Sequence, residues 1–377
     1  MAVAVTNDIL RDLAAFEAEG GCALSIYVDL DPSSTPTPAE ARTRLNALLA
    51  EAEKTADGHA RRRDCRLAVA DDLERISTWW ENELDRAGAR SLAIFASSAD
   101  DFFRTVPLSE GVSDGAYLAA ELYLRPLAGQ LGSGDGALVV LVSRERGVLY
   151  RLAGGRLVEV ADETDDLPGR HDQGGWSQAR YQRHIEKLVK DHLKSVGNEV
   201  AKRMRGGNDL VIVGVAPEEV RAEFEQKLSK DVRAALIGWT SAEAHVGPVE
   251  LLEAVRPLLD EAHARHEQET IERYQEERGR GSHASAGWKQ TLDAASDARV
   301  EVLLLEPSEE RPAWRCPRCG RASADGGKCP LDDTKLAERL DGADLAIHQT
   351  LLHGGTVLLV GQGRLGNADG IGALLRF

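Results

Sequence analysis

Short apolar runs alternate with longer amphipathic stretches along most of the chain, and this pattern is typical of an α/β protein. In the first third, apolar residues at helical spacing predict helices over residues 45–52 and 69–84. Alternating or β-branched runs predict strands over residues 23–30, 91–96, 102–108 and 121–126. Together these elements predict an N-terminal α/β domain over residues 1–130.

The middle of the chain repeats the alternation of strands and helices. Short apolar runs predict strands over residues 137–143, 147–152, 156–160, 210–215 and 235–239. One long helical pattern begins near Gln178 and another covers residues 249–277. Strands that alternate with helices predict a mostly parallel sheet, so residues 131–277 are expected to form a second α/β domain.

The last hundred residues predict a third α/β domain, residues 278–377. It contains an apolar strand at residues 300–305 and a Cys-rich insertion at residues 314–334. Residues 361–366 fit the pattern G-x-G-x-x-G, but only eleven residues follow Gly366. A nucleotide-binding unit needs about thirty residues. The motif is therefore predicted to be a turn between two strands.

Composition narrows the class of protein. The chain has 377 residues, a formal net charge of -16 and five cysteines. It contains no run of about 18 apolar residues, and its N-terminus lacks a basic start followed by an apolar core, so neither a membrane span nor secretion is predicted. The odd cysteine count predicts a reducing cytoplasm rather than a disulfide framework. Cys22 and Cys65 are interpreted as ordinary thiols.

A glycine-rich loop directly precedes the first long helix. Gly174 and Gly175 lack side chains and allow the backbone to approach a crowded target closely. Gln178 has both an amide donor and a carbonyl acceptor, so it can hold a water molecule, but it cannot act as a base near neutral pH. Such a loop suits a reaction that depends on positioning. His171 and Asp172 lack partner ligands at metal spacing, so a metal phosphohydrolase is not indicated.

The helix behind this loop has a basic stripe. From Trp176 to Arg205 the chain has eight Lys or Arg against three Asp or Glu. The stripe consists of Arg180, Arg183, Lys187, Lys190 and Lys194. An adjoining apolar face consists of Tyr181, Ile185, Leu188, Val189 and Leu193. A solvated face is one interpretation of the stripe, but its position behind the loop favours contact with a nucleic-acid backbone, with Trp176 stacking on a base.

Three cysteines and one aspartate lie at the spacing of a metal site. Cys316 and Cys319 have the knuckle spacing of a zinc ribbon, and Cys329 and Asp332 repeat that spacing with a carboxylate in the fourth position. These residues predict a structural zinc site of the Cys₃Asp type. The other interpretation is a ribbon that no longer holds metal.

The Gly-Gly loop resembles the tip of the catalytic domain in the eukaryotic and archaeal class-1 release factor superfamily. In that family a Gly-Gly-Gln tip enters the peptidyl transferase centre and promotes hydrolysis of peptidyl-tRNA. Here Trp176 and Ser177 separate the glycines from Gln178, a spacing more similar to the Vms-type peptidyl-tRNA hydrolases. Residues 281–288 and the terminal residues 369–377 resemble the start and the end of the third domain in the release factor and Pelota superfamily.

This resemblance implies three α/β domains and a ribosome-directed peptidyl-tRNA hydrolase in which Gln178, Gly174 and Gly175 are catalytic. It implies the ribosome and peptidyl-tRNA as partners and allows a translational GTPase. Some members carry a small zinc-binding insertion in the third domain. Two alternatives stay open: a Pelota-like factor that occupies the ribosomal A site without hydrolysis, in rescue or hibernation, and a zinc-ribbon nucleic-acid binder with no ribosomal role.

Overall fold

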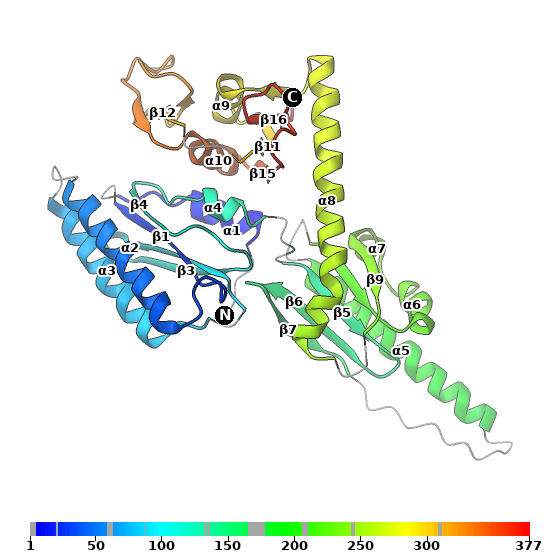
Figure 1. The fold of residues 1–377 in the computed structure, drawn as a ribbon. Helices are drawn as coiled ribbons and strands as arrows, with labels where there is room; N and C mark the ends of the chain where they lie inside the picture. Colours follow the sequence, from blue (N-terminus) through cyan, green and yellow to red (C-terminus); the bar gives the residue numbers. More distant parts are fainter. Residues whose placement is uncertain are drawn as a thin grey trace. The chain divides into compact units, whose positions relative to one another are not determined.

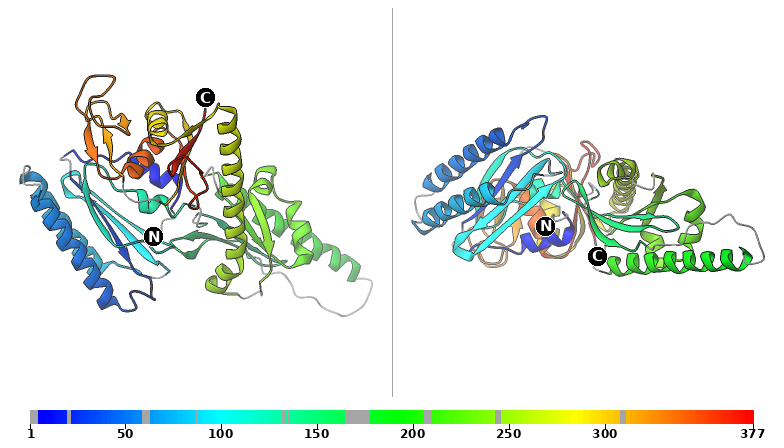
Figure 2. Two further views of the ribbon diagram at one scale, coloured as in Figure 1. Left: turned by 45° about the horizontal axis from the view of Figure 1, so that its top comes forward. Right: turned by 90° about the horizontal axis from the view of Figure 1, so that it is seen from below.

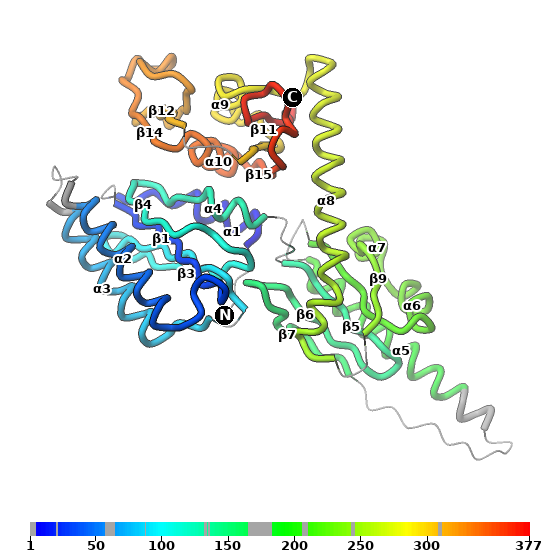
Figure 3. The backbone as a smooth tube through the Cα atoms, in the orientation of Figure 1, coloured from blue at the N-terminus to red at the C-terminus, as the bar shows by residue number. Residues whose placement is uncertain are grey.

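The computed structural model describes residues 5–377 except 20–21, 59–62, 87, 132–133, 135, 165–177, 206–209, 243–245 and 308–310. Contacts divide the chain into two compact units. The first unit contains residues 3–132 together with 264–377, and the second contains residues 133–263. Figures 1 and 3 follow the chain through both units by colour.

An antiparallel sheet forms the N-terminal part of the first unit, with strand order β3-β2-β1-β4. Its strands are β1 (Ala23–Asp29), β2 (Ser91–Ser97), β3 (Phe102–Leu108) and β4 (Gly115–Ala119). Helices α2 (Pro38–Gly58) and α3 (Arg63–Asn82) lie side by side on one face, as Figure 2 shows. Leu45 of α2 and Ile76 of α3 are fully buried against Ile26 and Ile94 of the sheet.

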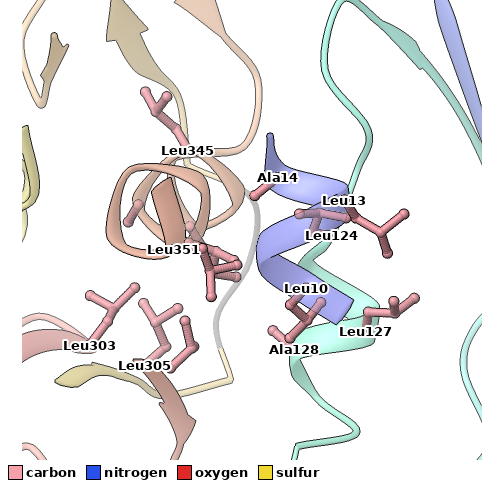
Figure 4. Packing of buried hydrophobic residues seen from close by; sticks show 14 of the residues in the cluster. Leu10, Leu13, Ala14, Leu124, Leu127, Ala128, Leu303, Leu305, Leu345 and Leu351 are labelled. Carbon is pink, nitrogen blue, oxygen red and sulfur yellow. The ribbon is translucent and has the colours of Figure 1, made fainter. Parts of the chain in front are cut away.

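The other face of this sheet contributes to a core that it shares with the C-terminal part of the chain. Helices α1 (Asn7–Ala14) and α4 (Arg125–Ala128) pack against α10 (Gly342–Leu352), as Figure 4 shows. Leu10 and Leu351 belong to one buried cluster that also contains Leu303. The two ends of the chain therefore bury one continuous core, although each end has its own sheet.

The C-terminal part has the strand order β10-β16-β11-β15, in which only β11 and β15 are parallel. Its strands are β10 (Ala284–Ala286), β11 (Val300–Leu305), β15 (Thr356–Leu359) and β16 (Ile371–Leu375), and α9 (Trp288–Ser296) packs beside them. Between β11 and α10 lies a small sheet made of β12 (Ala313–Arg315), β13 (Ala322–Ser323) and β14 (Ala337–Arg339). Residues 361–366 are a turn between β15 and β16, as predicted.

The second unit is built on a five-stranded sheet of order β7-β6-β5-β8-β9. Its strands are β5 (Leu138–Val142), β6 (Gly147–Ala153), β7 (Arg156–Asp162), β8 (Ile212–Val215) and β9 (Leu236–Thr240). One apolar cluster joins the sheet to α5 (Gln178–Met204), α6 (Glu218–Glu225) and α7 (Lys230–Ala235). A separate cluster joins it to the first turns of α8 (Pro248–Arg280), so helices cover both faces.

Three predictions need correction. Residues 121–126 do not form a strand, because Leu122 and Leu124 are buried in the shared core and the chain then turns into α4. The sheet of the second unit is mixed, since β5, β8 and β9 are parallel but β6 and β7 return as antiparallel hairpins. Cys22 and Cys65 form a disulfide, with Cα atoms 5.6 Å apart.

The mixed α/β architecture is confirmed, whereas the predicted division into three domains stays a prediction. Among the described residues, no helix is both long enough and apolar enough to span a membrane.

Candidate functional site

The predicted catalytic loop lies largely outside the described residues. Gly174, Gly175 and Trp176 belong to the segment 165–177, as do His171 and Asp172. Gln178 is the first residue of α5. The side chains of residues 178–182, which include Arg180, are also outside the description. The site is therefore built from the part of α5 that follows Arg183 and from the strands that support it.

Helix α5 is anchored by the face that its apolar periodicity predicts. Val189, Leu193, Val196 and Val200 are buried, with exposed fractions of 3% or less, against the sheet and against α6 and α7. Ile185, one turn earlier, is only partly buried. Among the described side chains of α5, which begin at Arg183, Val189 is the first that is fully buried. The described residues 183–188 have no fully buried side chain.

A face that adjoins the buried one carries positive charge. Arg183, Lys187, Lys190 and Lys194 are all exposed. Among the described residues, Lys187, Lys190 and Lys194 form no ion pair with a carboxylate. At the other end of α5, Glu199 pairs with Lys202 at 3.0 Å and with Arg203 at 2.7 Å, and these hydrogen bonds lower the pKa of Glu199. The lysines of the stripe are therefore exposed without a described carboxylate partner, although Glu186 and Asp191 are exposed on the same stretch of helix.

Two contacts that the sequence does not suggest fix α5 on its sheet. A Cβ atom at Gly147, the first residue of β6, would lie 2.3 Å from Cγ2 of Val196, so the absence of a side chain permits the close approach of helix and strand. Ser195 donates a 2.8 Å hydrogen bond to Glu163, which directly follows β7. Glu163 also donates its backbone N–H to the carbonyl of Gly147 at 2.6 Å. The chain is thus held against α5 where it enters the loop segment.

The four predicted metal ligands come together on the small sheet. The potential ligand atoms of Cys316, Cys319, Cys329 and Asp332 all lie within 4.8 Å of one another. The Sγ atoms of Cys319 and Cys329 are 3.5 Å apart, and both carboxylate oxygens of Asp332 lie 3.6 Å from Sγ of Cys316. Ligands on a tetrahedral zinc ion, at about 2.0–2.3 Å, lie about 3.3–3.8 Å from each other. The separations of the pairs Cys316–Asp332 and Cys319–Cys329 fall in this range, so the four side chains could hold a metal ion.

Tight turns bring these ligands together. Cys316 directly follows β12, and Gly320 takes a φ of +77° after the first ligand pair. Gly327, with a φ of +122°, precedes the second pair. Both values lie where glycine is favoured over residues with a side chain. The glycines therefore permit the backbone to bend around a common centre.

Local hydrogen bonds lower the pKa of two of the four groups, Cys316 and Asp332. Burial opposes ionisation of Cys316, but backbone N–H groups of Cys319 and Arg318 outweigh it and lower the pKa of this thiol. The backbone N–H of Thr334 donates to Asp332 and lowers the pKa of its carboxyl group. Burial raises the pKa of Cys329 to about 11. A bound cation would stabilise the Cys329 thiolate, because metal ligands must be deprotonated.

Part of the chain is similar in sequence to known proteins. Residues 123–267 match the family model described as bacterial archaeo-eukaryotic release factor family 10. The chain is 29% identical over 212 residues to peptide chain release factor subunit 1 of Methanopyrus kandleri, covering 53% of this chain and 51% of that protein. It is 30% identical over 216 residues to the same factor of Archaeoglobus fulgidus, covering 54% and 52%. The chain thus spans about half the length of these curated relatives.

Solved structures of the same group show lower similarity. An archaeal translation termination factor aRF1 aligns with 98% of this chain and 96% of its own at 16% identity and a TM-score of 0.29. Dom34 of S. cerevisiae, described as a translation termination-like factor, aligns with 76% and 79% at 12% identity and a TM-score of 0.39. Because these TM-scores are below 0.5, the likeness to known proteins rests on the sequence matches. By those matches, residues 123–267 are similar to bacterial archaeo-eukaryotic release factors, and about half of the chain is similar to archaeal release factor subunit 1.

Proposed function

We propose that the protein is a ribosome-directed factor that hydrolyses the ester bond of peptidyl-tRNA. The observation that carries this proposal is the geometry of α5. The helix begins at Gln178, and Val189 is the first fully buried residue among its described side chains. Within the described residues, the exposed Lys187, Lys190 and Lys194 form no ion pair. The turn from Arg183 to Lys187 is thus exposed on its charged side, and α5 follows directly after the Gly-Gly segment in sequence.

The charge of this helix favours a phosphate backbone as that partner. The exposed side chains of Arg183, Lys187 and Lys190 stand on a chain whose formal net charge is -16. No acidic residue lies in the first turn of α5, so its positive helix-dipole end is not neutralised there. Lysines at these positions would contact ribosomal or transfer RNA, and Arg180 and Trp176 would extend the same surface towards the loop.

Gln178 would position the attacking water. Its side-chain amide can orient a water molecule towards the ester carbonyl without exchanging a proton. Gly174 and Gly175 would let the backbone approach the ester closely, and a backbone N–H beside Gln178 would donate to the developing oxyanion. Peptidyl-tRNA and the ribosome are thus the proposed substrate and partner, with a translational GTPase as a further candidate. The spacing of the loop supports a mechanism like that of the Vms-type hydrolases.

The Cys₃Asp cluster would hold zinc in a structural role. Four ligands in tetrahedral spacing leave no coordination position for a reacting water, which is the feature of structural zinc sites. The ion would replace a buried apolar core in a small sheet whose three strands have only two or three residues each. It would therefore stabilise the insertion rather than take part in hydrolysis.

A Pelota-like role without hydrolysis is the second candidate. The retained glycines and Gln178 favour hydrolysis, whereas the insertion of Trp176 and Ser177 between them departs from the Gly-Gly-Gln tip and keeps this second role open. Such a factor would occupy the A site through the same basic helix and release no peptide.

The deciding experiment measures peptide release from stalled ribosomes that carry labelled peptidyl-tRNA. The wild type is compared with Gln178→Ala and with the control Gln226→Ala at the end of α6. Release that falls at least a hundredfold only in Gln178→Ala supports a hydrolase with Gln178 at its centre. Ribosome binding without release by any variant supports the Pelota-like role. Release that is equal in Gln178→Ala and the wild type contradicts the proposed mechanism.

A further inference from the structure

A cavity of about 390 Å³ lies inside the first unit, between strand β4 and helix α10. This volume is in the range of small-molecule sites. Leu118 of β4 and Glu121, which follows it, line one side, and Asp344, Leu345 and His348 of α10 line the other. The cavity is remote in sequence from the Gly-Gly loop, and the four cysteine-cluster ligands are not among its lining residues, although Arg315 of the wall directly precedes Cys316.

Most charged groups around the cavity already have partners. Arg315 and Arg339 both contact the carboxylate of Glu121. Asp341 accepts hydrogen bonds from Arg125 at 2.9 Å and from Tyr123 at 2.6 Å. The arginines of the wall are thus neutralised by carboxylates, so an anionic ligand finds no free cation among them.

The carboxylate of Asp344 has hydrogen-bond donors on only one of its two oxygens. Its Oδ1 accepts backbone hydrogen bonds from Leu124 at 2.7 Å and Arg125 at 3.0 Å. Its Oδ2 lies 3.7 Å from Nε2 of His348, which is too long for a hydrogen bond. Among the described residues, no lysine or arginine pairs with Asp344. One carboxylate oxygen on the cavity wall therefore lacks a donor.

His348 forms the wall beside Asp344. The side chain is 4% exposed, and its Nε2 lies 2.6 Å from the carbonyl oxygen of Leu122. Because a carbonyl only accepts, Nε2 carries the proton and donates it to Leu122. Nδ1 has almost no accessible surface, so it is not open to the cavity. The unpartnered oxygen of Asp344 therefore remains the acceptor that a ligand can reach.

Much of the remaining wall is apolar. Phe16, Leu345 and Leu352 line the cavity together with Leu118, and the polar residues Thr55, Glu338 and Gln349 complete it. Apolar walls with a few convergent polar groups are the usual composition of a site for a small organic molecule. We propose that this cavity binds an organic ammonium ion, whose hydrocarbon part lies against the apolar side chains and whose N–H groups donate to Asp344.

Calorimetric titration of the full chain with phenethylammonium chloride tests this proposal. The matched neutral probe is 2-phenylethanol, which has the same hydrocarbon part without the charge. A charge-assisted hydrogen bond to a carboxylate is worth about 1.5–3 kcal/mol, so the alcohol is expected to bind at least tenfold more weakly. Equal binding of both probes, or no saturable binding of the ammonium ion, overturns the proposal.

Two variants and one control locate the site. Asp344→Asn keeps an oxygen for the two backbone donors but removes the charge, and it is expected to weaken binding of the ammonium ion at least tenfold. Asp12→Asn removes an exposed carboxylate outside the cavity and is expected to leave binding unchanged. Unchanged binding in a folded Asp344→Asn variant overturns the assignment.

A second variant covers the case in which Asp344→Asn does not fold. Ala15→Trp adds bulk at an exposed residue of the cavity wall without replacing a core side chain. It is expected to abolish binding of phenethylammonium while the circular dichroism spectrum is retained. Binding as tight as in the wild type contradicts the location of the site.

Discussion

The hydroxyl of Tyr123 donates a 2.6 Å hydrogen bond to the carboxylate of Asp341. Tyr123 belongs to the N-terminal part of the first unit, and Asp341 caps the start of α10 in the C-terminal part by accepting from Ala343 and Asp344. One hydrogen bond thus links the orientation of α10 to the segment after β4.

The variant Tyr123→Phe removes this bond and keeps the ring that stacks on Tyr117 at 3.8 Å. We expect the free energy of unfolding to fall by about 1.5–3 kcal/mol, because the acceptor is charged and partly buried. Urea unfolding measures the loss. A double-mutant cycle with Asp341→Asn isolates the pairwise energy, and a coupling energy near zero would show that the contact does not stabilise the unit.

Asp344 makes the stability of the first unit depend on pH. Burial raises the pKa of Asp344 to about 6 from an ordinary value near 3.8. The folded state therefore binds this proton more tightly than the unfolded state. The resulting stabilisation is complete below about pH 4 and is lost as the pH rises through 6, by up to about 3 kcal/mol.

Asp344→Asn should remove this dependence. Relative to the variant, the wild type is expected to lose stability between pH 4 and pH 7, as measured by urea unfolding at each pH. The control Asp12→Asn should track the wild type at every pH. A difference between wild type and Asp344→Asn that stays constant over this range would show that Asp344 does not titrate there.

The cysteine cluster predicts that the protein binds zinc. Asp332 and Asp333 are adjacent in sequence, but only Asp332 belongs to the cluster, so substituting each in turn tests the ligand set. Asp332→Asn replaces a ligand carboxylate, so affinity for zinc is expected to fall at least tenfold in a competition titration with a chromogenic chelator. Asp333→Asn is the matched control, because Asp333 is exposed and pairs with Lys328 at 2.6 Å. Equal zinc affinity in both variants would remove Asp332 from the ligand set.

The basic stripe of α5 predicts a salt-sensitive interaction with ribosomes. Lys187→Glu combined with Lys190→Glu is expected to weaken binding at least tenfold and to lower the slope of log affinity against log salt concentration. Pelleting with ribosomes at several salt concentrations measures both effects. The control pair, Lys230→Glu with Lys289→Glu, reverses two exposed charges elsewhere and should bind like the wild type. Parallel losses in both pairs would indicate a general charge effect.

Elements with a strong local pattern were predictable from the sequence. The strands at β1, β3 and β11 alternate or are continuously apolar, and their predicted limits agree with the structure to within one residue. Residues 121–126 look like a strand for the same reason, but Leu122 and Leu124 are apolar because they fill a core shared with α10. Local periodicity cannot distinguish a run that is apolar because it forms a buried strand from one that is apolar because it fills a core without forming a strand.

For the candidate sites too, the sequence predicted contacts between residues close in the chain but not contacts that depend on tertiary packing. The cysteine spacing was sufficient to predict that Cys316, Cys319, Cys329 and Asp332 meet, because short turns join them. The disulfide between Cys22 and Cys65 spans 43 residues and depends on how α3 packs against β1. Contacts of this kind come from tertiary structure, as does the bond from Ser195 to Glu163 that ties α5 to the end of β7.

The shared core of the first unit also affects the order in which parts of the chain can fold during synthesis. Leu10 and Leu13 are buried in one cluster with Leu303 and Leu351. During synthesis from the N-terminus, α1 leaves the ribosome long before α10 exists, so its apolar face has no partner until nearly the whole chain has emerged. We expect this first helix to rely on chaperones during translation, and the second unit, whose residues are continuous in sequence, to fold before the first is complete.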